Sequence, residues 1–353
     1  MTQYRIIGLM SGTSLDGLDI AYCTFEHQPS SWKYHIIRAE TIPYSIEWAK
    51  RLRSAEKSSA FEFVQTDIDF GHLSGQLTRQ FIEKHQLIPD FIASHGHTIF
   101  HQPEKKITSQ IGCGAAIAAE TGIPVVCDFR SIDVALGGQG APLVPIGDKL
   151  LFPDFEFCLN LGGFANISFD DLGQRIAYDV CPVNIVLNDL AAREGYPYDP
   201  EGSLARKGSV NPPLLEKLNN LPWYHLDPPK SLGREWVLEN IIPLFTSPGL
   251  STFDLLATFC EHIAIQIATV TGKEKHHRVL ITGGGAMNQF LTERIRHHVI
   301  SPIVIPDTLT INFKEALIFA FLGLLRWSNE NNCLKSVTGA SIDHSGGCIY
   351  RPI

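Results

Sequence analysis

The stretch GLMSGTSLDGLDIAY at residues 8–22 carries three glycines, three serine or threonine hydroxyls and two aspartates. The apolar run over residues 4–10 predicts a buried strand, and the alternation over residues 18–25 predicts a second strand. The polar residues between these two strands therefore form the turn of a glycine-rich hairpin.

Two interpretations of this turn are open. In the first, it is a tight turn in which Gly12 and Gly17 supply positive φ and the hydroxyl side chains cap the exposed backbone. In the second, it binds phosphate: backbone N–H groups and hydroxyls donate to phosphate oxygens, and Asp16 holds Mg²⁺ through water. The turn alone does not decide between them.

Composition narrows the class of protein. The chain has 353 residues, of which 44% are hydrophobic and 19% charged, so it can bury a large core and is expected to form two domains. A formal net charge of -8 argues against nucleic-acid and anionic-membrane partners. The eight cysteines lack CxxC spacing and no signal-like segment is present, which favours reduced thiols in a cytoplasm. The longest apolar run, at residues 316–325, is too short to span a bilayer.

The chain divides into two halves with similar beginnings. The glycine- and proline-rich stretch at residues 128–145 has no helical or strand period, and we place the domain boundary there, giving domains 1–129 and 130–353. A second glycine turn, at residues 162–166, follows a strand early in the second half. Two similar α/β domains are therefore expected.

A third glycine turn lies near the end of the second half. The strand at residues 279–282 leads into three glycines and a helix that is expected to begin near Ala286. Free N–H groups at a helix N-terminus favour negative or polar ligand atoms. The turn has neither the GxGxxG pattern nor the Gly-Lys-Ser/Thr of a P-loop, so it indicates a nucleotide only together with the other two turns.

A series of motifs gives the chain a family resemblance. In chain order these are GLMSGTSLDG, SHGHTIFHQP, DFR, GGQGAPLVP, LNLGGFANIS, PPKSLGRE, GGGAMN and KEALIFAFL. The series resembles the successive motifs of the anhydro-N-acetylmuramic acid kinases, in the same order and over nearly the whole chain. SGTSLDG and GGQGAPLVP are specific to that family.

The resemblance implies a fold and a reaction. The fold is that of the actin-like ATPases and sugar kinases, with two similar α/β domains flanking a nucleotide cleft. The activity is that of an ATP- and Mg²⁺-dependent sugar kinase in cell-wall recycling. It hydrolyses the 1,6-anhydro bridge of anhydro-N-acetylmuramic acid and phosphorylates the 6-oxygen.

Three residues match the catalytic positions of the family. Asp179 would be the base that activates water, although an aspartate at a strand end can instead cap the following helix. Arg130 would position substrate and water, because a guanidinium is a fixed fork of donors. Glu315 would contact the sugar, although a glutamate in the first turn of a helix is also favoured by the helix dipole.

The resemblance also implies the binding residues. Those expected to bind ATP, with Asp16 holding Mg²⁺ through water, are Ser11, Gly12, Thr13, Ser14, Asp16, Gly17, Asn160, Gly162, Gly163, Asn166, Gly283, Gly284, Gly285 and Asn288. Those expected to bind the sugar are His95, His97 and Asn184. Three histidines, at positions 95, 97 and 101, raise the question of a zinc site. They lack the cysteines or carboxylates that would complete such a site in sequence.

The sequence departs from the family pattern at three places. The segment after Asp179 reads VCPV at residues 180–183, where the family has threonine and glycines, so the substrate side is expected to differ in shape. Position 97 is histidine where glutamine is common, and position 188 is asparagine where aspartate is frequent. ATP binding is thus better supported than the identity of the sugar.

Two other functions stay open on these grounds. One is a kinase of the same fold acting on a different sugar, and the other is a non-catalytic nucleotide-binding or chaperone-like ATPase module. The expected partner is a small sugar, with no nucleic acid and no membrane, and the expected assembly is a homodimer. Whether the C-terminal segment packs back onto the first domain is not decided by the sequence.

Overall fold

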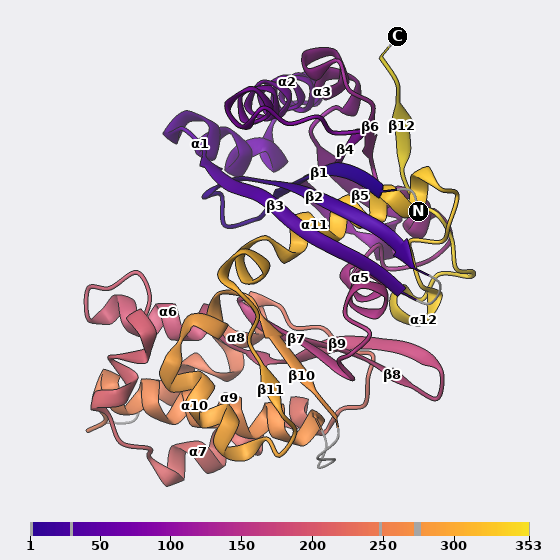
Figure 1. Ribbon diagram of the computed structural model, residues 1–353. Coiled ribbons are helices and arrows are strands. Elements are labelled where there is room, and N and C mark those ends of the chain that lie inside the picture. The colour runs from indigo at the N-terminus through magenta and orange to yellow at the C-terminus, as the bar shows by residue number, and fades with distance from the viewer. Residues whose placement is uncertain (1–2, 29–30, 247–248, 272–276, 353) are drawn as a thin grey trace. The chain divides into compact units, whose positions relative to one another are not determined.

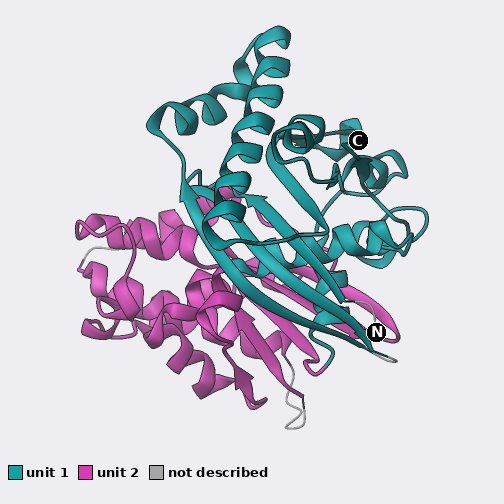
Figure 2. Cartoon of the chain, turned by 45° about the horizontal axis from the view of Figure 1, so that its top comes forward, with its two compact units in different colours: residues 1–153, 313–353 teal, residues 154–312 magenta. Residues whose placement is uncertain are grey.

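The computed structural model describes residues 3–28, 31–246, 249–271 and 277–352. The chain forms two compact units, which Figure 2 distinguishes by colour. Unit 1 comprises residues 1–153 and 313–353, and unit 2 comprises residues 154–312. The expected boundary after residue 129 therefore differs from the division that the structure shows.

Unit 1 is built on a mixed sheet of seven strands in the order β12-β6-β4-β1-β2-β3, with β5 paired to β4 (Figure 1). The strands are β1 (Gln3–Ser11), β2 (Gly17–Gln28), β3 (Ser31–Pro43), β4 (Phe91–Gln102), β5 (Ile107–Ile111), β6 (Val125–Cys127) and β12 (Cys348–Tyr350). Its helices are α1 (Ile46–Ser54), α2 (Ala60–His85), α3 (Gly114–Thr121), α4 (Ser131–Ala135), α5 (Val144–Leu151), α12 (Lys335–Thr338) and most of α11 (Thr308–Trp327).

Helices pack closely on this sheet because small residues allow it. Helix α11 lies against β1, where a Cβ on Gly8 would come within 1.9 Å of the Ala316 carbonyl oxygen. Helices α2 and α3 contact each other through Gly75, whose Cβ would lie 2.6 Å from Cβ of Glu120. Ser59 begins α2 with a capping box to Glu62, a local device that sets the helix start.

Unit 2 has a five-stranded sheet in the order β11-β10-β7-β8-β9. The strands are β7 (Phe157–Leu161), β8 (Phe164–Asp171), β9 (Gln174–Pro182), β10 (Val279–Thr282) and β11 (Ile303–Val304). The helices are α6 (Asn184–Arg193), α7 (Pro212–Asn219), α8 (Arg234–Asn240), α9 (Thr252–Val270) and α10 (Gln289–His298). Its core is a single cluster in which apolar residues of the strands meet the buried side of α9.

The two sheets share one topology, which confirms the prediction of two similar α/β domains. In unit 1, β1 pairs antiparallel with β2 and parallel with β4, β2 pairs antiparallel with β3, and β4 pairs parallel with β6. The same four pairings recur in unit 2. Strand β7 pairs antiparallel with β8 and parallel with β10, β8 pairs antiparallel with β9, and β10 pairs parallel with β11. Each half thus opens on a hairpin whose first strand lies inside the sheet.

The glycine-rich stretch at residues 128–145 belongs to unit 1, where hydrogen bonds to the Asp133 side chain hold it. Asp133 in α4 is fully buried, and its Oδ1 accepts from Cys333 Sγ at 3.0 Å, Thr338 Oγ1 at 2.7 Å and His344 Nε2 at 2.8 Å. Its Oδ2 accepts from the Gly140 N–H at 2.6 Å. Strand β12 also pairs antiparallel with β6. The C-terminal segment therefore packs back onto the first unit, which the sequence had left open.

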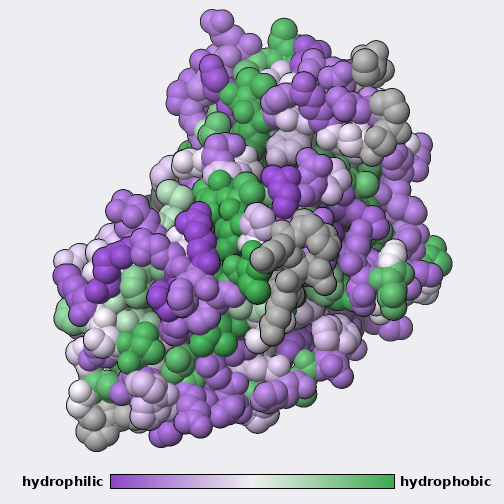
Figure 3. Space-filling view, turned by 60° about the horizontal axis from the view of Figure 1, so that its bottom comes forward, coloured by the Kyte–Doolittle hydropathy of each residue, from purple (hydrophilic) through white to green (hydrophobic). Residues whose placement is uncertain are grey.

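Two helices, α9 and α11, are long and apolar enough to cross a bilayer. Of their most apolar windows, 67% and 78% respectively are buried inside the protein, as in the core helices of soluble proteins, so they are weak evidence for a membrane. On the face drawn in Figure 3, hydrophilic residues cover most of the surface, and hydrophobic residues form smaller groups among them.

We expect Asp133→Asn to lower the free energy of unfolding by about 2 kcal/mol, because an amide cannot accept all the hydrogen bonds that the buried carboxylate accepts. Burial alone would raise the pKa of Asp133, but the bonds from His344, Cys333 and Thr338 hold it below 3.8. Because the folded-state pKa is the lower one, this stabilisation is present above the unfolded-state pKa and is lost as the pH falls through the folded-state value.

Urea unfolding at neutral and acid pH tests this prediction, with the exposed Asp171→Asn as the matched control. The difference between wild type and Asp133→Asn should shrink on acidification. A variant as stable as wild type at neutral pH contradicts the anchoring role.

Candidate active site

The predicted site residues fall into one group in each unit. The group in unit 1 contains the turn residues 11–17, His95, His97, Arg130 and Glu315. The group in unit 2 contains Asn160, Gly162, Gly163, Asn166, Asp179, Asn184, Gly283, Gly284, Gly285 and Asn288.

The first glycine turn connects β1 to β2, and its glycines differ in what they do. Neither Gly12 nor Gly17 has a positive φ, which corrects the tight-turn interpretation, and Leu15 takes that conformation instead at φ 62°. A Cβ on Gly17 would lie 2.5 Å from the Ile42 carbonyl oxygen, so Gly17 is required for packing against β3. At Gly12 the nearest atom to a Cβ, Ser14 Oγ, is 3.4 Å away. Gly12 therefore leaves room for a ligand to approach the backbone.

Ser11 is engaged inside unit 1. Its hydroxyl accepts from the Tyr44 hydroxyl at 2.7 Å and is hydrogen-bonded to His97 Nδ1 at 2.9 Å. Ser11 and His97 are buried, at 2% and 3% exposure, and burial lowers the pKa of His97. Thr13 and Ser14, in the same turn, are exposed. Ser14 donates to Asp16 Oδ1 at 2.7 Å.

Arg130 is held by His95 and a backbone carbonyl. Its Nε and Nη2 donate to His95 Nε2 at 3.1 and 2.9 Å, and its Nη1 donates to the Gly140 carbonyl oxygen at 2.6 Å. His95 Nδ1 donates to the Gly96 carbonyl oxygen at 2.9 Å, which assigns the ring proton to Nδ1. Burial, followed by the Arg130 charge, lowers the pKa of His95, so the ring is neutral. Both its nitrogens serve Arg130 positioning, which is a different role from the expected sugar contact.

Glu315 adds an acidic group to unit 1. It follows a break in α11 at Phe313, where φ is -118° and ψ is 16°, so it lies near the start of the regular part of that helix. The residue is accessible to solvent. Protein atoms around its carboxyl raise its pKa above 4.5, the Arg130 charge opposes this shift, and Asp19 adds to it. Glu315 therefore binds a proton more readily than an ordinary glutamate.

The second glycine turn is fixed by the start of α6. The N–H groups of Val183 and Ile185 donate to the Gly163 carbonyl oxygen at 2.8 and 3.3 Å, and that of Asn184 donates to Gly162 at 3.2 Å. A Cβ on Gly163 would meet no atom within 4 Å. The turn thus has a rigid backbone with an open outer side, as a phosphate-binding turn requires.

Asp179 lies on β9 and is held as a hydrogen-bond acceptor. Its Oδ2 accepts from the Leu232 N–H at 2.7 Å and from Ser231 Oγ at 3.2 Å, and its Oδ1 accepts from the Asn166 side-chain amide. Burial raises the pKa of Asp179 above 3.8, and these three hydrogen bonds oppose the shift. Helix α6 has no side-chain cap, so the interpretation of Asp179 as a helix cap is wrong. Asn166, expected at the nucleotide, contacts this carboxylate.

The apolar segment after Asp179 faces the interior of unit 2. Val180 is 3% exposed, and Cys181 and Val183 are fully buried, all within the hydrophobic cluster. The expectation that these side chains alter the substrate side is therefore wrong, because they pack in the core.

The third glycine turn contains two packing glycines and one open glycine. Gly283 has φ 82°, and a Cβ there would lie 2.6 Å from Asn160 Oδ1. A Cβ on Gly285 would lie 2.7 Å from Leu161 Cβ, whereas the nearest atom to one on Gly284, Asn184 Nδ2, is 3.8 Å away. Only Gly284 of the three leaves space for a ligand.

The helix expected to begin near Ala286 starts later. A short 3₁₀ turn over Gly284–Met287 comes first, and α10 follows with Asn288 as its N-cap. The Asn288 side chain accepts from the Leu291 N–H at 2.9 Å, so its carbonyl oxygen is used in capping. Periodicity alone does not distinguish a 3₁₀ turn from the first turn of an α-helix.

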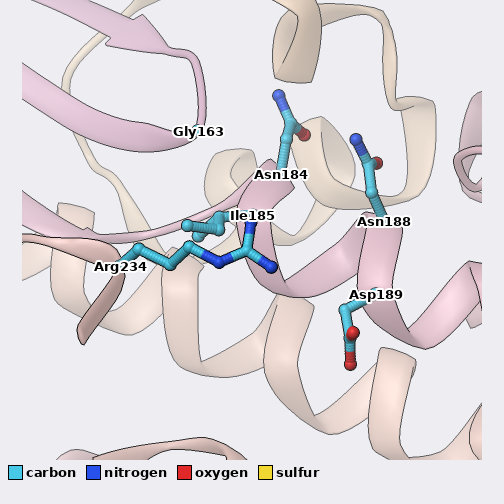
Figure 4. Close-up of a pocket in the computed structure, with 6 residues that line it drawn as sticks. All are labelled: Gly163, Asn184, Ile185, Asn188, Asp189 and Arg234. Carbon is cyan, nitrogen blue, oxygen red and sulfur yellow. The ribbon is translucent and has the colours of Figure 1, made fainter. Parts of the chain in front are cut away.

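A pocket of about 480 Å³ lies beside the second glycine turn (Figure 4). Its lining residues are Gly163, Asn184, Ile185, Asn188, Asp189 and Arg234. Of these, sequence reasoning did not assign a role to Ile185, Asp189 or Arg234. Arg234 lies in the motif PPKSLGRE, which was the available sign of a functional role.

A family model and full-length relatives name the same family over nearly the whole chain. A family model described as "Anhydro-N-acetylmuramic acid kinase" matches residues 4–352. The protein of that name from Vibrio cholerae is 35% identical over 370 residues, covering 98% of each chain. The one from Methylobacterium nodulans is 34% identical over 377 residues, covering 99% of this chain and 100% of its own. The solved structure of component A of Acidaminococcus fermentans (R)-2-hydroxyglutaryl-CoA dehydratase covers 90% of this chain and 96% of its own, at 12% identity and a TM-score of 0.46.

Proposed function

Because the chain belongs to the anhydro-N-acetylmuramic acid kinase family, we propose that it hydrolyses the 1,6-anhydro bridge of anhydro-N-acetylmuramic acid and phosphorylates its 6-oxygen with ATP. The family match over residues 4–352 carries this proposal. The arrangement of hydrogen bonds around Asp179 supports it, because the carboxylate is oriented and its pKa is raised by burial.

In the first part of the reaction, Asp179 acts as the general base. A water oxygen bonds to the anomeric carbon, the bond from that carbon to the bridging oxygen breaks, and the water proton passes to the Asp179 carboxylate. A base with a raised pKa accepts this proton more readily than an ordinary aspartate. The bonds from Leu232 and Ser231 to Oδ2 hold the carboxylate in one orientation.

In the second part, the released 6-oxygen attacks the γ-phosphorus of ATP and ADP leaves. Such a transfer requires chiefly positioning and neutralisation of charge. Arg130 stays protonated, since burial lowers its pKa only to about 10, and its contacts with His95 and Gly140 keep the guanidinium in place. Glu315 accepts hydrogen bonds from the sugar hydroxyls.

The nucleotide is bound by the open glycine turns. Gly12 and Gly163 approach the phosphates, and Gly284 approaches the adenosine, since each has room beside its backbone. Asp16 is exposed and bonded to Ser14. Burial raises the pKa of the neighbouring Asp19 and the Asp16 charge adds to this shift, so hard oxygen ligands suited to Mg²⁺ gather at this turn. Bound Mg²⁺ would neutralise phosphate charge, with Asp16 holding it through water.

The proposed substrate indicates the cell compartment in which the enzyme works. A sugar released from the cell wall is phosphorylated where ATP is available, so we place the protein in the cytoplasm, in peptidoglycan recycling. We propose a homodimer with neither nucleic acid nor membrane as a partner, in keeping with the net charge of -8.

Mass spectrometry of the product formed in oxygen-18 water tests this function. Incubation with anhydro-N-acetylmuramic acid, ATP and Mg²⁺, quenched early, should give the 6-phosphate with the label on the anomeric carbon and none on the phosphate. N-acetylmuramic acid, N-acetylglucosamine and glucose serve as comparison substrates. Faster phosphorylation of any of these would favour a kinase for a different sugar. ATP hydrolysis without any phosphorylated sugar would favour an ATPase module.

A further inference from the structure

Arg234 is an exposed cation that lines the pocket of unit 2. It begins α8, and its side chain extends toward α6, where Asn184 and Asn188 lie (Figure 4). Within the described part of the chain, its guanidinium makes no ion pair. The one carboxylate lining the pocket, Asp189, pairs instead with Arg193 at 3.4 Å.

The rest of the pocket lining suits an anionic ligand group. The Asn188 amide can donate hydrogen bonds, and Gly163 contributes open backbone at the second glycine turn. Asn184 donates its amide to the Leu161 carbonyl oxygen at 3.1 Å, which fixes its position. A guanidinium beside an open turn offers paired donors at the spacing of the oxygens of a carboxylate or phosphate.

Arg234 is also close in the chain to residues that bind the proposed base. The segment just before it supplies both Leu232 N–H and Ser231 Oγ, which donate to the Asp179 carboxylate. A ligand group held by Arg234 would therefore be placed in a defined position relative to Asp179. We infer that Arg234 binds an acidic group of a bound substrate in this pocket.

This inference rests on the proposed function, which offers two sources of such a group. One is the carboxylate of the lactyl ether on anhydro-N-acetylmuramic acid, and the other is a phosphate of ATP. Both are oxyanions that a guanidinium can bind through two parallel hydrogen bonds. Binding of the sugar carboxylate would make Arg234 a determinant of sugar specificity.

The test compares wild type with Arg234→Gln, Arg234→Lys and the control Arg296→Gln, which removes an exposed arginine elsewhere in unit 2. KM is measured for ATP, for anhydro-N-acetylmuramic acid and for 1,6-anhydro-N-acetylglucosamine, which lacks the lactyl carboxylate. ADP affinity is measured by calorimetry without sugar, and melting temperature confirms folding.

Arg234→Gln should weaken one substrate by about tenfold or more, the effect of losing a charge-assisted hydrogen bond. If the group is the sugar carboxylate, KM rises for anhydro-N-acetylmuramic acid alone. The difference in KM between this acidic sugar and the uncharged 1,6-anhydro-N-acetylglucosamine then becomes smaller. If it is a phosphate, KM for ATP rises, and ADP affinity falls as well when that phosphate is the α- or β-phosphate. In either case Arg234→Lys should recover only part of the loss, because it keeps the charge and loses the fork.

The inference is overturned if Arg234→Gln resembles Arg296→Gln in all three KM values and in ADP affinity. Failure of the proposed function looks different, since wild type would then phosphorylate neither anhydrosugar. The calorimetric comparison would still report whether Arg234 binds phosphate.

Discussion

Asp179→Asn should lower turnover by about a hundredfold to ten-thousandfold, the contribution that general acid–base catalysis usually makes. The amide keeps the size of the side chain and an oxygen that can accept from Leu232 N–H, but it cannot take a proton from water. ADP affinity should stay near the wild-type value, because Asp179 is proposed to act on water and sugar. Steady-state kinetics measure the turnover, calorimetry measures the ADP affinity, and the melting temperature checks that the variant is folded.

Asp199→Asn is the matched control for this prediction. Asp199 is also a buried acceptor in unit 2, and its carboxylate binds the N–H groups of Leu204 and Ala205 at 2.7 and 3.0 Å. Its substitution should lower the melting temperature without a selective loss of turnover. If Asp179→Asn is folded and keeps near-normal turnover, Asp179 is not the base.

The pH dependence of turnover gives a second measure of the same role. Because burial raises the pKa of Asp179, the acidic limb of the rate profile should lie above 3.8, the ordinary value for aspartate. The rate should fall as the pH drops through that limb, since a protonated carboxyl cannot act as a base. In Asp179→Asn this limb should disappear from the residual activity.

Gly284→Asp should reduce ATP and ADP affinity by at least about a hundredfold, because a carboxylate would enter the space left for the nucleotide and clash with it. A Cβ at this position meets no protein atom closer than 3.8 Å, so the protein has room where the side chain begins. The melting temperature without ligand should therefore remain close to wild type. Calorimetry with ADP measures the loss.

Gly285→Ala separates packing from ligand binding in the same turn. Its Cβ would lie 2.7 Å from Leu161 Cβ, so this variant should lose stability. Wild-type ADP affinity in Gly284→Asp would remove residues 283–285 from the nucleotide site, whatever the Gly285 variant does.

Local features of the fold could be predicted because their causes are local. The hairpin at residues 8–22 follows from an apolar run, a polar glycine turn and an alternating run, and the structure has β1 and β2 there. Helix α2 begins where Ser59 and Glu62 make a capping box. The order of the motifs was sufficient to indicate the family, since a series of short motifs requires no knowledge of how side chains pack.

The domain boundary could not be predicted, because long-range contacts decide it. The stretch at residues 128–145 has the composition of a linker, but Asp133 within it binds His344, 211 positions away in the chain. No pattern around either residue indicates the other. A buried carboxylate must find its donors wherever the fold provides them, so this anchoring belongs to the tertiary structure.

The sequence by itself determined the α/β class, the two hairpin-led halves and the family, because these depend on periodicity, turn chemistry and the order of motifs. Only the tertiary structure decided what each site residue contacts. It placed Val180, Cys181 and Val183 in the core, engaged the Ser11 hydroxyl with His97, and brought Arg234 into the pocket beside Asn184 and Asn188. The physical reason is that burial and hydrogen bonding depend on neighbours distant in the chain, whereas strand alternation and turn conformation depend on neighbours close by.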